Sequence, residues 1–532
     1  MESVSLFHAN DIYNAEKASR FLYQWKQAKE RELETAGRTC LSFFSGDAWS
    51  PSIMTTIVRG KQMIPVLNAL KLDAACLGNH DLDLGLAEFA MLTAECNFPW
   101  ICSNVRDKNV GEPLGGCEEY VLLEAANSKF LVLGLVEEEW IDTLSTIEPS
   151  DIDFEDFTVY VKRRVPELMA EHKDVDAVIA MSHMRMPNDY KLAKECSGYI
   201  DIILGGHDHH YEDTEINHIR ILNSGTDFGD FTVIQILGRD DKVTIGDSSA
   251  ILSHPLATKS ERVNVDPKSS DEDPEMVEAL KHIQEQMAAS MDTVIGSTKV
   301  DLDARFSEIR TKETNISNLI ATVMTRATGA DVAILNAGSL RADRIIPKGP
   351  LKVRDLCDLL PMADPLAVVV LSGATLLQAL ENGVSKYPAM EGRFPCVSGV
   401  KFSFDPSKPA GERVVEGSVS VSKQSSGEYK PLDLDQNYRV VSKAYLLKGK
   451  DGYDMLAGQK IVVDDENCPA LAIALRNLFT EISVMKRWEG LTSKSSVIAA
   501  ASQFKKMIRR SIADPYAIRP KVDGRISNIA EA

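Results

Sequence analysis

The chain has 532 residues, of which 44% are hydrophobic and 26% are charged, and its formal net charge is −19. This apolar content is sufficient for a large buried core and excludes global disorder. The acidic balance would repel nucleic acids and anionic membranes, so neither is an expected partner. At roughly 100–200 residues per domain, the length suggests about three domains, or two large ones.

The cysteines and the N-terminal segment favour an intracellular protein. The nine cysteines are scattered, and some lie within apolar runs such as Ala75-Cys76-Leu77, which favours reduced core thiols over a disulfide framework. Val4-Ser5-Leu6-Phe7 is strand-like, with no basic region followed by an apolar run, so we expect no signal peptide. No stretch reaches the roughly 18 apolar residues of a membrane span. The expected location is the cytoplasm, and the sequence leaves the oligomeric state open.

The first half of the chain, to about residue 255, alternates short apolar segments with segments of helical periodicity. The predicted strands include 40–45, 130–135, 176–181, 200–204 and 231–237, and the predicted helices include 15–30 and 156–173. This alternation is typical of a layered α/β domain. In open α/β sheets, ligands bind beyond the carboxyl ends of the strands.

Residue types that ligate metals follow these apolar segments in turn. The candidate ligands are Asp11, Asp47, Asn79, His183, His207 and His209. Asp11 and Tyr13 lie two residues apart on an extended segment, as do the last two histidines, so each pair shares one face. Mixed nitrogen and oxygen ligands suit Zn, Mn, Co or Fe rather than Ca. Two such metals close together supply a nucleophile and the charge compensation that phosphate ester hydrolysis needs.

The pattern changes after residue 265. Residues 266–274 are polar, acidic and bounded by prolines, and a helix-like run follows at 275–291. A second unit then shows predicted strands at 331–335, 366–371, 400–404 and 438–443 and helices at 315–328 and 374–384. We predict a first domain at 1–255, a linker with a helix at 256–294, a second domain at 295–465 and a helical extension at 466–532 that contains a basic stretch, 505–510.

The ordered ligand set resembles the calcineurin-like metallophosphoesterase superfamily, and over roughly residues 3–465 the chain resembles its 5′-nucleotidase family. The resemblance implies an N-terminal four-layer αββα sandwich and a smaller α/β substrate-binding domain. It implies one metal held by Asp11, Asp47 and His209 and a second held by Asp47, Asn79, His183 and His207, so that Asp47 bridges them.

The same resemblance implies two catalytic residues. His80 matches the family histidine that contacts the phosphoryl group and the leaving oxygen, and Asp83 matches the carboxylate that orients it. A helix N-cap is the alternative role for Asp83. The expected reaction is direct attack by an activated water, without a covalent phosphoenzyme.

The second domain carries segments similar to the family's substrate-binding segments. The matching residues are Arg310, Asn336, Gly338, Arg341, Arg393, Phe394, Tyr445 and Asp451. Arg310 and Arg341 match phosphate contacts, because a guanidinium offers phosphate a bidentate fork. Phe394 and Tyr445 match two rings that sandwich a nucleobase, and Asp451 matches a ribose-binding carboxylate. Core packing is the alternative for each ring, and an ordinary turn is the alternative for Asp451.

Tyr13 departs from the family, which has histidine at this position. Three interpretations stay open. Water could fill the position with Tyr13 contributing nothing, or the tyrosine could be a phenolate ligand that favours Fe(III), since a phenol with a pKa of about 10 needs a strong Lewis acid to ionise. In the third interpretation the first metal is weak or absent and the protein is slow or inactive.

The sequence therefore predicts a metal-dependent phosphomonoester hydrolase that acts on nucleotides through two divalent or mixed-valence metal ions. Lys450 brings charge to the segment before Asp451, which favours a phosphorylated sugar or another small cytosolic metabolite as the alternative substrate. A nucleotide-binding protein with a degenerate metal site is the second alternative, and Tyr13 motivates it.

Overall fold

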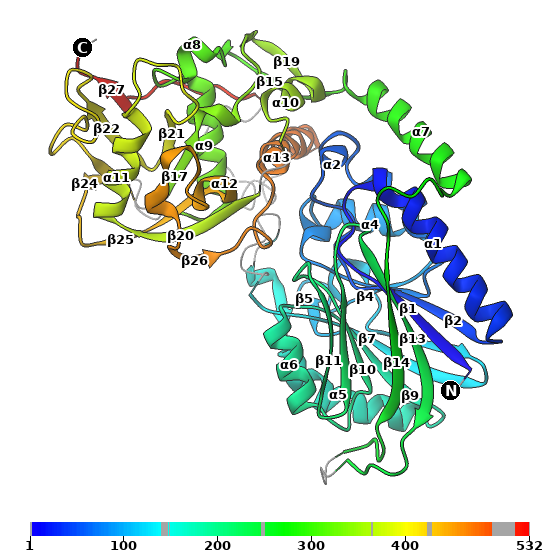
Figure 1. Ribbon diagram of the computed structural model, residues 1–532. Helices are drawn as coiled ribbons and strands as arrows, with labels where there is room; N and C mark the ends of the chain where they lie inside the picture. Colours follow the sequence, from blue (N-terminus) through cyan, green and yellow to red (C-terminus); the bar gives the residue numbers. More distant parts are fainter. Residues whose placement is uncertain are drawn as a thin grey trace. The chain divides into compact units, whose positions relative to one another are not determined.

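The computed structural model describes residues 3–139, 147, 149–245, 250–362, 365–422, 428–491 and 517–530 (Figure 1). The chain forms two compact units, residues 1–288 and residues 289–532, which are described separately. No helix in these described ranges has the length and the apolar content that a membrane crossing needs. All nine cysteines are free; three are half-buried and the others are buried.

The first unit contains two six-stranded sheets. The first sheet has the order β14 (Leu256–Asn264), β13 (Asp230–Arg239), β1 (Val4–Ala9), β2 (Thr39–Phe44), β3 (Ala74–Cys76) and β4 (Trp100–Ile101). The second has the order β11 (Tyr211–Ile216), β12 (Ile219–Ser224), β10 (Ile202–Gly205), β9 (Ala177–His183), β7 (Ser128–Val136) and β6 (Tyr120–Ala125). β1, β2, β3 and β4 run parallel, as do β7, β9, β10 and β12, so the carboxyl ends within each set lie at one edge.

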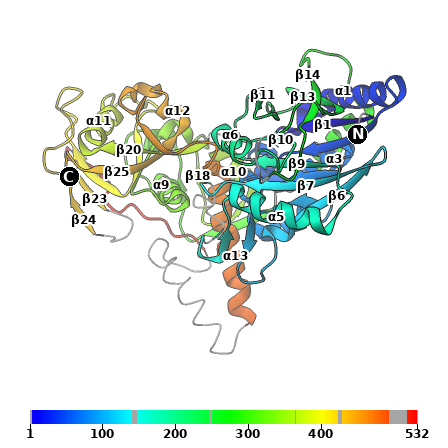
Figure 2. The same ribbon diagram turned by 90° about the horizontal axis from the view of Figure 1, so that it is seen from below.

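Helices cover the outer face of each sheet. The helices of the first unit are α1 (Ala18–Glu30), α2 (Ile53–Val58), α3 (Ile64–Leu70), α4 (Leu86–Thr93), α5 (Phe157–Glu171) and α6 (Met186–Glu195). A core cluster joins α1, α3 and α4 to both sheets, and a second cluster joins α5 and α6 to the second sheet. Figure 2 shows α5 and α6 beside the strands of that sheet. The predicted four-layer sandwich is confirmed.

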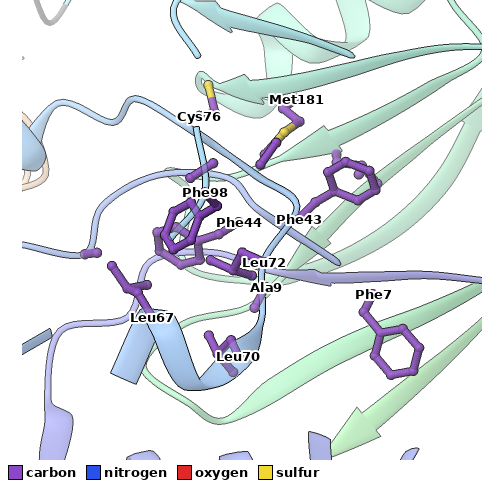
Figure 3. Close-up of a cluster of buried hydrophobic side chains, with 14 of the residues drawn as sticks. Phe7, Ala9, Phe43, Phe44, Leu67, Leu70, Leu72, Cys76, Phe98 and Met181 are labelled. Atoms are coloured by element: carbon purple, nitrogen blue, oxygen red, sulfur yellow. The ribbon is translucent and has the colours of Figure 1, made fainter. Parts of the chain in front are cut away.

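Aromatic side chains fill the core beneath the first sheet. Trp25 of α1 packs against Phe7 and Phe231, with ring centroids 5.2 Å apart in both pairs. Figure 3 shows the neighbouring part of the core, where Phe43 and Phe44 of β2 lie close to Met181 of β9. Burying one such ring contributes about 1.5–3 kcal/mol. This packing gives the strand ends of the two sheets a rigid base.

The second unit is built on a five-stranded sheet with the order β21 (Pro395–Ser398), β17 (Val332–Asn336), β25 (Asn437–Lys443), β20 (Leu366–Ser372) and β26 (Lys460–Val463). Its longer helices are α9 (Asn315–Thr328), α11 (Gly373–Val384) and α13 (Leu471–Leu491). Thr314 and Ser317 form a capping box at the start of α9, and Gly329 ends this helix with a left-handed φ of 63°. A smaller sheet has the order β24 (Tyr429–Pro431), β23 (Ser420–Ser422), β22 (Val400–Phe404) and β27 (Ile526–Asn528).

The structure differs from the predicted segments at two places. Residues 256–264, predicted as linker, form β14 of the first sheet, because their alternating side chains pair along β13. The predicted linker helix is α7 (Pro274–Ser290). Within the predicted helical extension, α13 is helical, whereas residues 526–528 form β27, which pairs in parallel with β22 of the second unit. The basic stretch 505–510 lies outside the described residues.

Candidate metal centre and substrate pocket

The six candidate metal ligands lie at the carboxyl ends of strands in the first unit. Asp11 follows β1, Asp47 follows β2, Asn79 follows β3, His183 ends β9, and His207 and His209 follow β10. Asp11 and Asp47 sit on adjacent loops, because the amide of Asp11 donates to the Gly46 carbonyl at 3.0 Å and that of Ile12 to the Asp47 carbonyl at 3.0 Å. Five of the six side chains are buried, and that of His209 is 25% exposed.

Four of these side chains form one compact group of ligand atoms. Asp47 Oδ2 lies 3.2 Å from His183 Nε2, and Asn79 Oδ1 lies 3.0 Å from the same nitrogen and 3.1 Å from Nδ1 of His207. For metal–ligand bonds of about 2.1 Å, neighbouring ligand atoms lie about 3.0–3.4 Å apart. The spacing therefore fits a single metal ion held by Asp47, Asn79, His183 and His207, the set that the family resemblance implied.

A second group shares one atom with the first. His209 Nε2 lies 3.4 Å from Asp11 Oδ1 and 2.7 Å from the Tyr13 hydroxyl oxygen. That hydroxyl lies 3.3 Å from Asp47 Oδ2, the same oxygen that faces His183. Asp47 Oδ2 thus borders both groups, reaching the second through the Tyr13 hydroxyl. Tyr13 lies inside the group implied for the first metal.

The electrostatics of the cluster favour a bound cation. Burial raises the pKa of the Asp47 carboxyl, but the neighbouring His183 outweighs it and the pKa is lowered. Burial likewise lowers the pKa of His183, yet Asp47 and Asp11 raise it to about 10. For His207, burial and the positive charge of His183 lower the pKa to about 3. Carboxylates this deep require positive charge beside them, and a mixed nitrogen and oxygen donor set fits a transition-metal ion.

The ligand loops hold an uncommon backbone conformation. Asp11, Asp47, His207 and His209 have positive φ angles of 53°, 65°, 80° and 55°. Left-handed φ at a non-glycine residue costs roughly 1–3 kcal/mol and persists only where surrounding contacts impose it. Four such residues among six ligands indicate a site that the fold stabilises against local preference.

Asp81 supplies part of this support and was not singled out from the sequence. Its carboxylate accepts hydrogen bonds from the amides of Asp47, Ala48, Trp49 and Gly78 at 2.8–3.2 Å. The loop of Asp47 is thereby tied to the loop of Asn79. Burial and the charge of Asp47 raise the pKa of Asp81 to about 7. The only sequence signal is its place in Gly78-Asn79-His80-Asp81.

Asn10 supports the Asp11 side in a similar way. Its side-chain amide donates to Asp11 Oδ2 at 2.5 Å, to Asn223 Oδ1 at 2.9 Å and to the Gly225 carbonyl at 2.8 Å. These contacts join the end of β1 to the end of β12 and the loop after it. The sequence separation of more than 200 residues explains why sequence reasoning missed the role of Asn10.

The predicted catalytic pair is assembled beside the metal ligands. His80 Nδ1 lies 3.0 Å from Asp83 Oδ2, which also accepts a hydrogen bond of 2.6 Å from Ser50 Oγ. The amide of His80 donates to Asp47 Oδ1 at 2.8 Å. Both side chains are buried. Asp83 therefore orients the imidazole directly, and the N-cap residue of α4 is Gly85 and not Asp83.

A separate pocket lies within the second unit. Its volume is about 380 Å³, within the range of small-ligand sites. The lining residues are Arg310, Asn336, Gly338, Arg341, Met362, Glu391, Gly392, Arg393, Lys443, Tyr445 and Asp451. Seven of the eight residues assigned to substrate binding are in this set. Met362, Glu391, Gly392 and Lys443 were not predicted.

The pocket combines strong positive charge with a fixed carboxylate. Burial and the neighbouring Arg341 lower the pKa of the Arg310 guanidinium, so two like charges are held close together. The Nε atom of Arg310 is buried and has no hydrogen-bond partner among the described residues. Asp451 accepts hydrogen bonds from Asn336 at 2.7 Å and from Tyr445 at 3.0 Å. An anionic group beside the arginines would offset the repulsion between their two positive charges and would give the Nε atom of Arg310 a hydrogen-bond acceptor.

Phe394 requires a correction. Its side chain is 2% exposed, belongs to the core of the second unit and packs against Phe404 with ring centroids 6.4 Å apart. It does not line the pocket, whereas Tyr445 does and is 40% exposed. The described pocket therefore presents one of the two expected rings. Lys450, the reason for considering a phosphorylated sugar, is exposed and does not line the pocket.

Comparison with known proteins agrees with this geometry. Residues 43–211 match the calcineurin-like phosphoesterase family, and residues 294–458 match the 5′-nucleotidase C-terminal domain. The chain therefore joins a calcineurin-like phosphoesterase domain to a 5′-nucleotidase C-terminal domain. This pair of domains makes the chain a metallophosphoesterase, a hydrolase acting on phosphoric ester bonds, and calcineurin-like metallophosphoesterases use divalent metals.

Proteins named as nucleotidases or nucleotide phosphoesterases align over most of the chain. A 5′-nucleotidase of Bos taurus is 25% identical over 87% of this chain and 86% of its own length. The trifunctional nucleotide phosphoesterase YfkN of Bacillus subtilis is 27% identical over 85% of this chain, which spans 32% of that longer protein. The NAD nucleotidase of Haemophilus influenzae shares the fold, with a TM-score of 0.72, 15% identity and coverage of 99% and 98% of the two chains.

Proposed function

We propose that the chain hydrolyses nucleotide phosphomonoesters with two metal ions bound at the cluster around Asp47. The observation that carries this proposal is the shared oxygen: Asp47 Oδ2 borders both groups of ligand atoms. A site for one metal ion does not need a carboxylate oxygen that is shared between two groups of ligands. Two-metal hydrolases use the two ions together to stabilise both the attacking and the leaving oxygen.

The roles of the ligands follow from the two groups. One position would be held by Asp11, Asp47 and His209 and the other by Asp47, Asn79, His183 and His207, with Mn, Zn, Co or Fe as candidate ions. When bound, the metals activate the attacking water and compensate charge on the phosphoryl oxygens. Asp81 and Asn10 keep the ligand loops in register, so the carboxylates need little reorganisation on binding.

His80 and the arginines would act on the substrate itself. With its Nδ1 held by Asp83, His80 would deliver a proton to the leaving oxygen or stabilise charge there. The guanidinium groups of Arg310 and Arg341 would bind the anionic end of the substrate in the second-unit pocket. There the exposed ring of Tyr445 would stack on a base, and Asp451, already held by Asn336 and Tyr445, would accept a ribose hydroxyl.

One observation favours a second candidate, a phosphorylated sugar or another small metabolite. Arg393 and the buried Lys443 add two cations to the pocket wall, and Phe394 offers no ring. A pocket with one ring and four cations suits a small polar phosphate at least as well as a flat base.

The test is phosphate release from a panel of nucleoside monophosphates, a UDP-sugar and sugar phosphates. Metal-stripped protein would be reloaded with Mn, Zn, Co or Fe, alongside Asp47→Asn. Asp174→Asn is the matched control, because this exposed carboxylate pairs only with Lys129 among the interactions described for it.

We expect metal-dependent turnover of nucleotides that Asp47→Asn abolishes and Asp174→Asn leaves unchanged. Turnover of sugar phosphates alone would select the second candidate. Nucleotide binding without turnover of any substrate would support instead a binding protein with a degenerate metal site. The cytoplasmic location is also a proposal, which cell fractionation would test.

A further inference from the structure

Tyr13 occupies the position at which the family resemblance expects a histidine ligand. We infer that its phenolic oxygen is a ligand of the first metal position and that this position takes trivalent iron. The inference rests on the proposed two-metal function and specifies one of its metals, and the geometry around the Tyr13 hydroxyl supports it.

The hydroxyl oxygen of Tyr13 is part of a four-atom cage. It lies 3.2 Å from Asp11 Oδ1, 3.3 Å from Asp47 Oδ2 and 2.7 Å from His209 Nε2, and the first and last of these atoms lie 3.4 Å apart. Ligands of one ion with bonds of about 2.1 Å stand about 3.0–3.4 Å from one another. The distances from the phenolic oxygen to Asp11 and Asp47 are those of a fellow ligand, and the shorter distance to His209 requires only a small separation of these two atoms on metal binding.

These four atoms can also act together as electron-pair donors. The phenolic oxygen faces two carboxylate oxygens and an imidazole nitrogen, and each of these four atoms carries a lone pair that a metal ion can accept. A cation bound among them would replace the phenolic proton as the positive charge that the carboxylates face.

Tyr13 is also held in place. Its side chain is 7% exposed, and its ring packs against His209 at 5.4 Å and edge-on against His80 at 6.3 Å between centroids. On either side, the amide of Ile12 bonds to the Asp47 carbonyl and that of Asn14 to Asp227. A side chain clamped in this way cannot swing out to leave its place to water, which argues against Tyr13 as a bystander.

The donor set distinguishes the two metal positions. The Tyr13 position offers three oxygens that can each carry negative charge and one imidazole, whereas the other position offers one carboxylate, one neutral amide oxygen and two imidazoles. Hard anionic oxygens favour a small ion of high charge, and imidazoles suit divalent zinc or iron. On binding, the phenolic proton leaves to solvent and the iron–oxygen bond replaces it, without any change of oxidation state.

The test is the visible absorption spectrum, because ferric phenolate centres have a broad charge-transfer band that zinc or manganese centres lack. Metal-stripped full-length protein would be loaded with Fe(III) plus Zn(II), or with Zn(II) alone, and its metal content measured. The variants are Tyr13→Phe, Tyr13→His, and Tyr23→Phe as the matched control on α1, outside the ligand set.

We expect the band in the iron-loaded wild type and in Tyr23→Phe, and its complete loss in Tyr13→Phe and Tyr13→His. Zinc retained in the tyrosine variants would show that they fold and keep the other position. A wild type that binds iron and releases phosphate without the band would overturn the inference and leave the proposed function intact. Persistence of the band in Tyr13→Phe would also overturn it. Failure of the wild type to bind any metal would remove the proposed function and the inference together.

Discussion

Gly78→Ala probes how closely the two ligand loops approach each other. A Cβ atom at Gly78 would lie 2.6 Å from the Asp47 amide nitrogen and 2.9 Å from Asp47 Cγ, with the carboxylate oxygen closer still. Gly78 is not among the glycines with positive φ, so the substitution tests space and not backbone strain. Restoring an ordinary contact of about 3.4 Å requires the bridging carboxylate to move by about 1 Å.

The expected cost follows from that displacement. A misplacement of about 1 Å at a catalytic group lowers turnover about 10²-fold, and forcing a methyl group into packed surroundings destabilises the fold by about 1–3 kcal/mol. Phosphate release, bound metal per chain and thermal unfolding would be measured together. Gly111→Ala is the control for general destabilisation: a Cβ there meets nothing within 4 Å and the residue is exposed, but its positive φ of 77° makes the substitution strain the backbone away from the ligand loops.

The informative result is loss of turnover and metal in a protein that still unfolds cooperatively. Wild-type turnover and metal content in Gly78→Ala would refute the reasoning, since it would show that the loops adjust without moving Asp47. Equal loss in the Gly111 control would attribute the effect to general destabilisation.

Three further predictions concern the same unit. Asp83→Asn should lower kcat about 10²-fold with little change in KM, because the carboxylate orients His80. An unchanged kcat would contradict this, and Ser50→Ala, which removes a second hydrogen bond to Asp83, is the control. Burial lowers the pKa of His8 to about 3, so the unfolded chain gains a proton below about pH 6.5 that the folded chain does not. Wild-type stability should therefore fall about 1.4 kcal/mol per pH unit more steeply than that of His8→Gln between about pH 6 and 4, and denaturant unfolding with parallel slopes for the two proteins would contradict it. Chelation should lower the free energy of unfolding by about 4 kcal/mol when the metal stood at about 1,000 times its Kd, whereas Asp47→Asn should show almost no shift with chelator; equal shifts would place the metal elsewhere.

The sequence by itself determined the chemistry of the metal centre. Apolar runs that end in Asp, Asn or His can be recognised locally, and the carboxyl ends of parallel strands meet at one edge. Asp11, Asp47 and His183 could therefore be assigned to one site before any contact between them was known. The layered α/β class followed in the same way, because hydrophobic periodicity depends on neighbours only a few residues apart.

The tertiary structure decided which atoms face which. Three features depend on residues far apart in the chain. Asp47 Oδ2 borders both ligand groups, Asp81 ties two loops together, and Phe394 lies in the core instead of the pocket. The same holds for β27, whose three residues are a strand only because β22 lies beside them. Local sequence specifies what a side chain can do, whereas burial and pairing depend on long-range packing. This packing places Tyr13 beside Asp11, Asp47 and His209, the ligands implied for the first metal.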